Sequence, residues 1–234
     1  MPVLEDLKFD IDIDLILRVS GYGKDRDPPK KFIDSASEMR DLCQKLARPK
    51  VVYETYGISG LDEGLVKING TELKGKVLIN VLRGSERAIV FVGTLGPKLD
   101  EEVNRLSSEG EILLSATLDT IGALALGLSS LDFYKKVLVT EAESTDFALT
   151  PSFGPGECKW DITEQRVIFD LVDATSIGVK MNESYLMLPK KSRSGIMGIG
   201  PKDRISKATP CDLCDRKDCP GRDMLEIMRS HDEI

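Results

Sequence analysis

The chain has 234 residues, 41% of them hydrophobic, and a net charge of −7. This length and composition suit one globular core or two small ones, and the acidic charge argues against a nucleic-acid partner. The segment from Met1 to Asp14 is acidic, unlike a secretory signal, and no unbroken run of eighteen apolar residues follows. We therefore expect a cytoplasmic protein with no nucleic-acid and no membrane partner.

The first elements follow from hydrophobic periodicity. Apolar and acidic residues alternate from Phe9 to Leu15, which predicts an extended strand or arm over residues 7–19. Pro28 and Pro29 then precede a helical apolar stripe that includes Cys43, so a long helix is predicted and Cys43 is interpreted as a small buried hydrophobe. β-branched and aromatic residues predict a strand over 50–56, and residues 76–82 and 87–92 are predicted to pair as an apolar hairpin.

Two helices are predicted in the middle of the chain. The turn at residues 92–97 carries glycines that can cradle a phosphate, but Asp100, Glu101 and Glu102 fill the first turn of the next helix and would repel an anion. A capped turn is the favoured interpretation. The second helix, from residue 111 to about residue 130, contains Gly122 and Gly127, which permit close approach of a neighbouring element.

The most specific stretch runs from Phe153 to Gly200. Residues 154–156 form a Gly-Pro-Gly loop, and Asp161 with Glu164 predicts the capped start of a helix. Residues 177–188 and 192–199 are predicted to be strands joined by a turn at 189–191. Small residues at the start of the second strand indicate either an edge strand or close approach of a ligand or another backbone.

The residue types and spacing of this stretch match a known family. The matching positions are Phe153, Pro155, Gly156, Trp160, Gln165, Ile177, Gly178, Val179, Asn182, Glu183, Ser184, Met187, Pro189, Ser192, Ser194 and Gly195. Further matches near the front are Leu17, Arg18, Gly21, Tyr22, Pro49, Val52 and Tyr53. The chain therefore resembles the reactivation (S-adenosylmethionine-binding) domain of cobalamin-dependent methionine synthase, in a free-standing form.

The resemblance implies an α+β fold over residues 1–205, with a curved antiparallel sheet and flanking helices. It implies reductive reactivation of a cobalamin (corrinoid) dependent methyltransferase such as methionine synthase, with S-adenosylmethionine as methyl donor. The cobalamin would belong to the partner protein, and a flavodoxin- or ferredoxin-type protein would donate electrons.

The family's methyl-donor site corresponds to the Pro-Gly loop and the strand after it. The implied cofactor-binding residues are Phe153, Pro155, Gly156, Glu157, Trp160, Ser192, Ser194 and Gly195. Trp160 has two interpretations, stacking on a corrin or adenine ring or packing in the core. The family usually carries Arg and Tyr where this chain has Ser152 and Glu157, and such an arginine would pair with the donor's carboxylate.

The predicted C-terminal tail, residues 206–234, holds Cys211, Cys214 and Cys219 within nine residues. Closely spaced thiols on a polar loop are typical of a zinc or iron–sulfur site, and Cys158, His231 or an exogenous group could be the fourth ligand. The alternatives are reduced surface thiols or a redox disulfide. These cysteines carry the second functional hypothesis, a metal-binding docking module for a corrinoid protein that performs no methyl transfer. One histidine in the chain excludes triads and zinc-protease sites built on several histidines.

Overall fold

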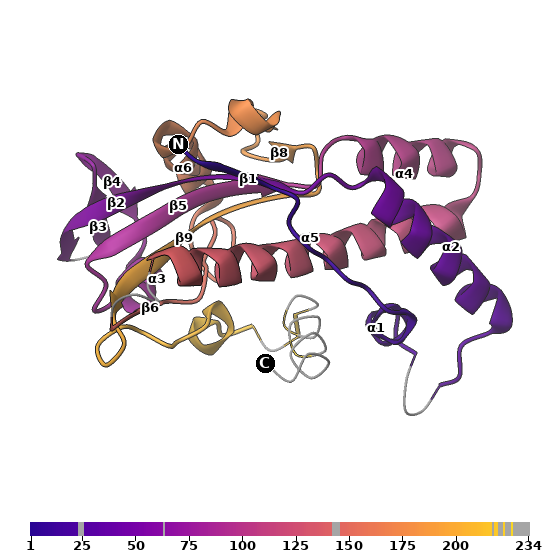
Figure 1. The fold of residues 1–234 in the computed structure, drawn as a ribbon, viewed down its shortest axis with the longest axis horizontal. Helices are drawn as coiled ribbons and strands as arrows, with labels where there is room; N and C mark the ends of the chain where they lie inside the picture. The colour runs from indigo at the N-terminus through magenta and orange to yellow at the C-terminus, as the bar shows by residue number, and fades with distance from the viewer. Residues whose placement is uncertain are drawn as a thin grey trace.

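A computed structural model describes residues 1–22, 26–62, 64–141, 146–216, 218, 219, 222 and 226. A curled antiparallel sheet in the order β4-β3-β2-β5-β9-β6, with β1 also paired to β2, lies along a long helix, α5 (Figure 1). The strands are β1 (Val3–Glu5), β2 (Lys50–Asp62), β3 (Leu65–Ile68), β4 (Thr71–Lys74), β5 (Arg87–Thr94), β6 (Phe147–Leu149), β7 (Lys180–Met181), β8 (Met187–Leu188) and β9 (Ser192–Pro201). The helices are α1 (Ile13–Val19), α2 (Lys30–Leu46), α3 (Lys76–Val81), α4 (Lys98–Ser108), α5 (Ile112–Glu141) and α6 (Gln165–Leu171), with 3-10 turns η1 (Ile162–Glu164), η2 (Ala174–Ile177) and η3 (Pro210–Leu213).

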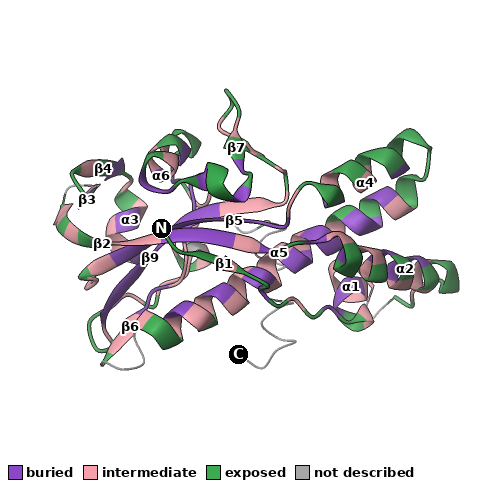
Figure 2. Cartoon of the chain, turned by 45° about the horizontal axis from the view of Figure 1, so that its top comes forward, coloured by how far each residue is buried: buried purple, intermediate pink, exposed green. Residues whose placement is uncertain are grey.

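Strand β5 is the centre of the sheet, and its whole length pairs with β2 on one edge and β9 on the other. Because side chains alternate along a strand, Val90 and Val92 enter one core while Ile89 and Phe91 enter another. Both faces of this strand are covered, which explains its almost continuous apolar sequence. Figure 2 shows β5 and β9 as largely buried strands between partly exposed helices.

Three apolar cores follow from this arrangement. The first lies between one face of the sheet and the segments α3, α6 and η2, and it contains Phe153 and Trp160. The second joins the other sheet face to Phe133 and Val137 near the end of α5. The third lies among α1, α2, α4 and the first half of α5. Helix α5 therefore packs against both the sheet and the helical layer.

By length and composition alone, α5 is the kind of helix that could cross a membrane. Among the described residues it contacts α2 and α4 along one part and the sheet along another, and ten of its residues are buried. At Gly122, the side chain of Lys191 comes so near that an added Cβ would lie 3.1 Å from Lys191 Cε. These contacts are those of a central core helix and confirm the close approach expected at Gly122.

Most predicted elements are present. The structure confirms α2, β2, β5, α4, α5 and β9, and it extends β2 to Asp62 and α5 to Glu141. Cys43 is fully buried, and burial raises the pKa of its thiol to about 12. In the turn before α4, the Gly96 N–H donates to Thr94 Oγ1 at 3.1 Å, and the Leu95 N–H donates to the Lys191 carbonyl at 2.9 Å. The Gly96 amide therefore binds within its own turn and the Leu95 amide binds the neighbouring turn between β8 and β9, so neither N–H is open to a phosphate, although Pro97 at the start of α4 makes no side-chain cap.

Two predicted strands are helices. The hairpin prediction was wrong at residues 76–82, because they form α3, which buries Leu78 and Val81, while β5 pairs with β2 and β9. The arm predicted over residues 7–19 contains α1, because the Asp12 carboxylate accepts the Leu15 N–H at 2.7 Å and caps a helix. Short apolar runs fit a buried strand and a buried helix equally well.

The strand predicted over residues 177–188 was also wrong. Gly178 adopts a left-handed conformation at the end of η2, and the Asn182 side chain accepts the N–H groups of Ser184 and Leu186 at 2.9 and 3.0 Å. These two turns reduce the expected strand to the two-residue strands β7 and β8. Asparagine side chains commonly make such turns by binding the backbone ahead of them.

Candidate functional site

The Pro-Gly loop lies along the outer edge of β9. The Phe153 N–H donates to the Ile196 carbonyl at 2.9 Å, and the Ile196 N–H donates back to the Phe153 carbonyl at 2.8 Å. An added Cβ at Gly195 would lie 2.5 Å from the Phe153 oxygen, and one at Gly154 would lie 2.6 Å from the Ser194 oxygen. Glycine is required at these two positions because the loop backbone approaches the strand so closely. The small residues of β9 therefore mark a backbone approach.

The loop closes on itself after Pro155. The Gly156 N–H donates to the Trp160 carbonyl, and the Trp160 N–H donates to the Glu157 carbonyl, both at 2.8 Å. Cys158 and Lys159 have φ angles of 38° and 73°, in the left-handed region that only a tight turn imposes on such residues. The turn leaves Gly156 exposed and Glu157 and Cys158 partly exposed.

Trp160 fixes the loop to the first core. It is 1% exposed and stacks on Phe153 with 5.6 Å between ring centroids, and its Nε1–H donates to the Lys74 carbonyl at 3.0 Å. The indole therefore has its polar group paired and its ring buried, as a packing role requires.

Ser194 and Ser192 differ in their surroundings. Ser194 is buried and donates to Gln165 Oε1 at 2.8 Å, while Gln165 Nε2 has no hydrogen-bond partner among the described residues. Ser192 is partly exposed, donates to the Pro189 carbonyl at 2.7 Å and lies 2.9 Å from Thr94 Oγ1. The predicted site residues are thus brought together along one strand edge. Three of the predicted site residues reach the surface: Gly156, Glu157 and Ser192. The other five are buried beneath the loop or in β9: Phe153, Pro155, Trp160, Ser194 and Gly195.

Arg193 is a charged residue of this surface that sequence reasoning missed. Its guanidinium lies 3.4 Å from Glu157 Oε1, while Glu157 Oε2 accepts the Gly154 N–H at 3.0 Å. The two side chains are 29% and 38% exposed. The signal was present in the sequence, because a residue between two small strand residues points to the opposite face. The loop thus has a cation beside it despite the serine at position 152.

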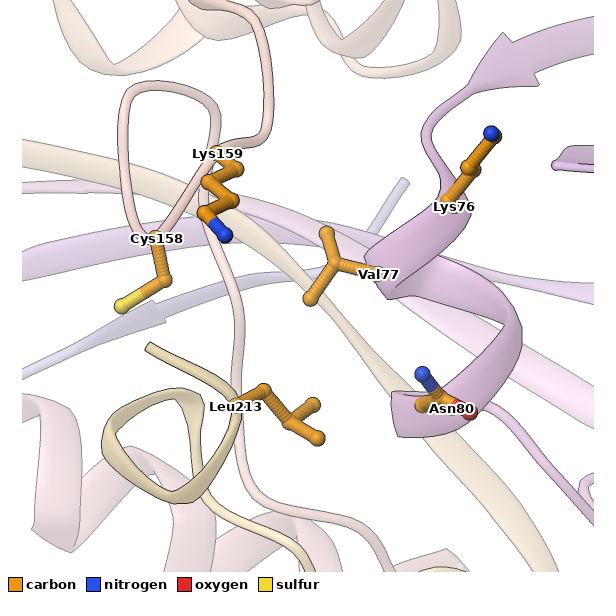
Figure 3. A pocket seen from close by; sticks show the side chains of 6 residues that line it. All are labelled: Lys76, Val77, Asn80, Cys158, Lys159 and Leu213. Carbon is orange, nitrogen blue, oxygen red and sulfur yellow. The ribbon is translucent and has the colours of Figure 1, made fainter. Parts of the chain in front are cut away.

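Beside the loop is an open hollow of about 360 Å³. Figure 3 shows Cys158 and Lys159 of the loop on one side and residues of α3 on the other, with Leu213 of the C-terminal segment below. Lys159 forms an exposed ion pair with Asp215 of the same segment. The predicted tail therefore contacts the loop through residues on both sides of Cys214.

The cysteine thiols of the loop and the tail meet. Burial, followed by the nearby Cys214 thiol, raises the pKa of Cys158 to about 12. The Arg216 N–H, followed by Cys158, lowers the pKa of Cys214 below its ordinary value. Within the residues that the structure describes, no three or more His, Cys, Asp or Glu side chains lie close enough to hold a metal ion. His231 lies outside the described residues.

Comparisons with known proteins identify the fold. No protein-family model matches the chain, and no curated protein matches it. Among solved structures, the chain is similar to one described as the crystal structure of the MetH reactivation domain bound to AdoHcy, with a TM-score of 0.60 and 14% identity. The match covers 100% of this chain and 86% of that chain. The chain therefore has the fold of that domain, which confirms the predicted α+β class with its curled antiparallel sheet.

Proposed function

We propose that the chain reactivates a cobalamin-dependent methyltransferase such as methionine synthase, using S-adenosylmethionine as methyl donor. The observation that carries the proposal is the fold shared over the whole chain with a reactivation domain whose solved structure holds AdoHcy, the demethylated form of that donor. A second support is the Pro-Gly loop, which lies on β9 where the resemblance puts the methyl-donor site.

The exposed groups of the loop and β9 suit different parts of the methyl donor. Arg193 is a cation beside the loop and would turn from Glu157 to pair with the donor's carboxylate in a charge-assisted hydrogen bond. Glu157 would place its carboxylate near the sulfonium once Arg193 turns to the ligand. Gly156 adds no side chain, so a ligand can lie against the loop backbone. Ser192 points to the opposite face of β9 from Arg193 and would instead support the start of the strand through Pro189 and Thr94.

The buried residues of the site would act through these exposed groups. Phe153, Trp160 and Gly195 hold the loop against β9, so the Glu157 carboxylate beside Gly156 is positioned before a ligand arrives. Such preorganisation lowers the entropic cost of binding. The bound donor would supply the methyl group that restores the partner's corrinoid after its one-electron reduction. A flavodoxin- or ferredoxin-type protein in the cytoplasm would supply that electron.

Isothermal titration with S-adenosylmethionine and with AdoHcy tests the proposal. We expect saturable binding at one site per chain, weakened about 10-fold or more by Arg193→Ala because a charged hydrogen bond contributes about 1.5–3 kcal/mol. Arg204→Ala is the matched control, since Arg204 is exposed and its ion-pair partner is its neighbour Asp203. Absence of heat and of a thermal shift at millimolar ligand would contradict methyl-donor binding.

A further inference from the structure

Glu157 is held by the loop at its backbone and at one carboxylate oxygen. Its N–H donates to the Gly154 carbonyl at 3.1 Å, and its carbonyl accepts the Trp160 N–H at 2.8 Å. Its Oε2 accepts the Gly154 N–H at 3.0 Å. The second oxygen, Oε1, is the one that meets Arg193. Glu157 can therefore exchange the partner of Oε1 while the other bonds keep its carboxylate in place.

The ion pair between Glu157 and Arg193 is easily opened. The Arg193 Nη2 lies 3.4 Å from Oε1, and because both side chains are partly exposed, water competes for both charges. The residue opposite Arg193 in β5 is Gly93, which has no side chain to fix the guanidinium. Within the described part of the chain, Arg193 is also the one cation that pairs with Glu157, since Lys159 pairs with Asp215. Arg193 can thus turn to the carboxylate of a ligand and leave Glu157 open to another cation.

The two ligands of the proposed function differ at their sulfur. Both carry a carboxylate and an amino group, but the sulfur of S-adenosylmethionine is a positively charged sulfonium and that of AdoHcy is a neutral thioether. When the methyl group moves to the partner's corrinoid, already reduced by the electron-donor protein, the cobalt's electron pair forms the new bond. The electron pair of the broken carbon–sulfur bond stays on sulfur. The ligand therefore loses its positive charge at sulfur while its carboxylate is unchanged.

We propose that Glu157 is the residue that distinguishes the methylated donor from its demethylated product, an inference that rests on the proposed function. With S-adenosylmethionine bound, Arg193 pairs with the ligand's carboxylate and Glu157 with the sulfonium, so two ion pairs replace the one that opens. With AdoHcy bound, the sulfur offers Glu157 no charge, and Glu157 competes with the ligand's carboxylate for Arg193. The same side chain therefore favours binding of the donor and release of the product.

Isothermal titration of the full chain with each ligand tests this role through the ratio of the two dissociation constants. We expect the wild type to bind S-adenosylmethionine about 10-fold more tightly than AdoHcy, and Glu157→Gln to bring the two affinities within about 2-fold of each other. Glutamine keeps the size of the side chain and an oxygen that can accept the Gly154 N–H, so the loop is retained. Arg193→Ala should weaken both ligands by a similar factor and keep their ratio, because both carry the carboxylate.

Glu38→Gln is the matched control. It removes the same charge from an exposed position of α2, in the helical layer, and should keep the wild-type ratio. A wild type that binds both ligands equally would overturn the role of Glu157 and leave methyl-donor binding standing. The same holds if Glu157→Gln weakens both ligands equally, since Glu157 would then face the amino group that they share. A wild type that binds neither ligand would contradict the proposed function itself, and the role of Glu157 with it.

Discussion

The substitution Gly195→Ala should detach the Pro-Gly loop from the sheet. The added methyl group would lie 2.5 Å from the Phe153 oxygen and 3.1 Å from Phe91 Cζ, and neither neighbour is a flexible chain end. Relief requires the loop to move away, which breaks the hydrogen bonds of 2.9 and 2.8 Å between Phe153 and Ile196. Two net hydrogen bonds and the overpacking together should cost about 2–4 kcal/mol of unfolding free energy.

Urea unfolding followed by circular dichroism measures this cost. With an m-value near 3 kcal/mol/M, the midpoint should fall by about 1 M, without a change in m. Gly57→Ala is the matched control, because Gly57 lies in β2 with no atom near an added Cβ, and it should shift stability by less than about 1 kcal/mol. If Gly195→Ala unfolds at the wild-type midpoint and binds AdoHcy as well as the wild type, the loop does not rest on β9 as described.

Three further predictions concern stability and reactivity. Ser194→Ala should cost about 1–3 kcal/mol in the same urea assay, because Gln165 Oε1 would lose its buried partner, and an unchanged midpoint would argue against that hydrogen bond. Burial raises the pKa of Asp132, but the Lys8 N–H and Lys136 outweigh it and lower the pKa below its ordinary value. The ionised Asp132 therefore stabilises the fold above about pH 4, and this contribution is lost as the pH falls through the lower pKa of the folded state. Asp132→Asn should therefore be less stable than wild type at pH 7 and equal to it at strongly acid pH, and a pH-independent difference would contradict this. In metal-free native protein a disulfide reagent should leave Cys43 unmodified until the protein unfolds, since that thiol is buried.

The sequence predicted the helices and strands whose hydrophobic periodicity fits only one type of secondary structure. A long amphipathic helix after two prolines and the apolar strand β5 could be read directly, because their lengths and periods exclude the alternative. The run at residues 76–82 could not, since a seven-residue segment with five apolar residues fits a strand or a short buried helix. Neither could the short helix capped by Asp12, because alternating apolar and acidic residues also suit an amphipathic turn.

The candidate site was predicted as a segment rather than as a surface. The Pro-Gly loop and the small residues of β9 were identified, but the sequence did not show that Ser194 and Gly195 serve the packing of that loop. The position of Arg193 between two small strand residues put it on the other face of β9, but only the folded loop places Glu157 beside it. The contact of Cys158 with Cys214 joins distant segments, so spacing could offer it only as one option among several.

The proposed reactivation is tested most directly by transfer of a labelled methyl group. The protein is mixed with a methyltransferase partner that holds cob(II)alamin, a low-potential reductant and S-adenosylmethionine labelled in its methyl group. The account predicts label on the partner's corrinoid and stoichiometric AdoHcy, both of which depend on this chain and are reduced by Arg193→Ala. A stable complex with the partner in which no label reaches the corrinoid would contradict methyl transfer.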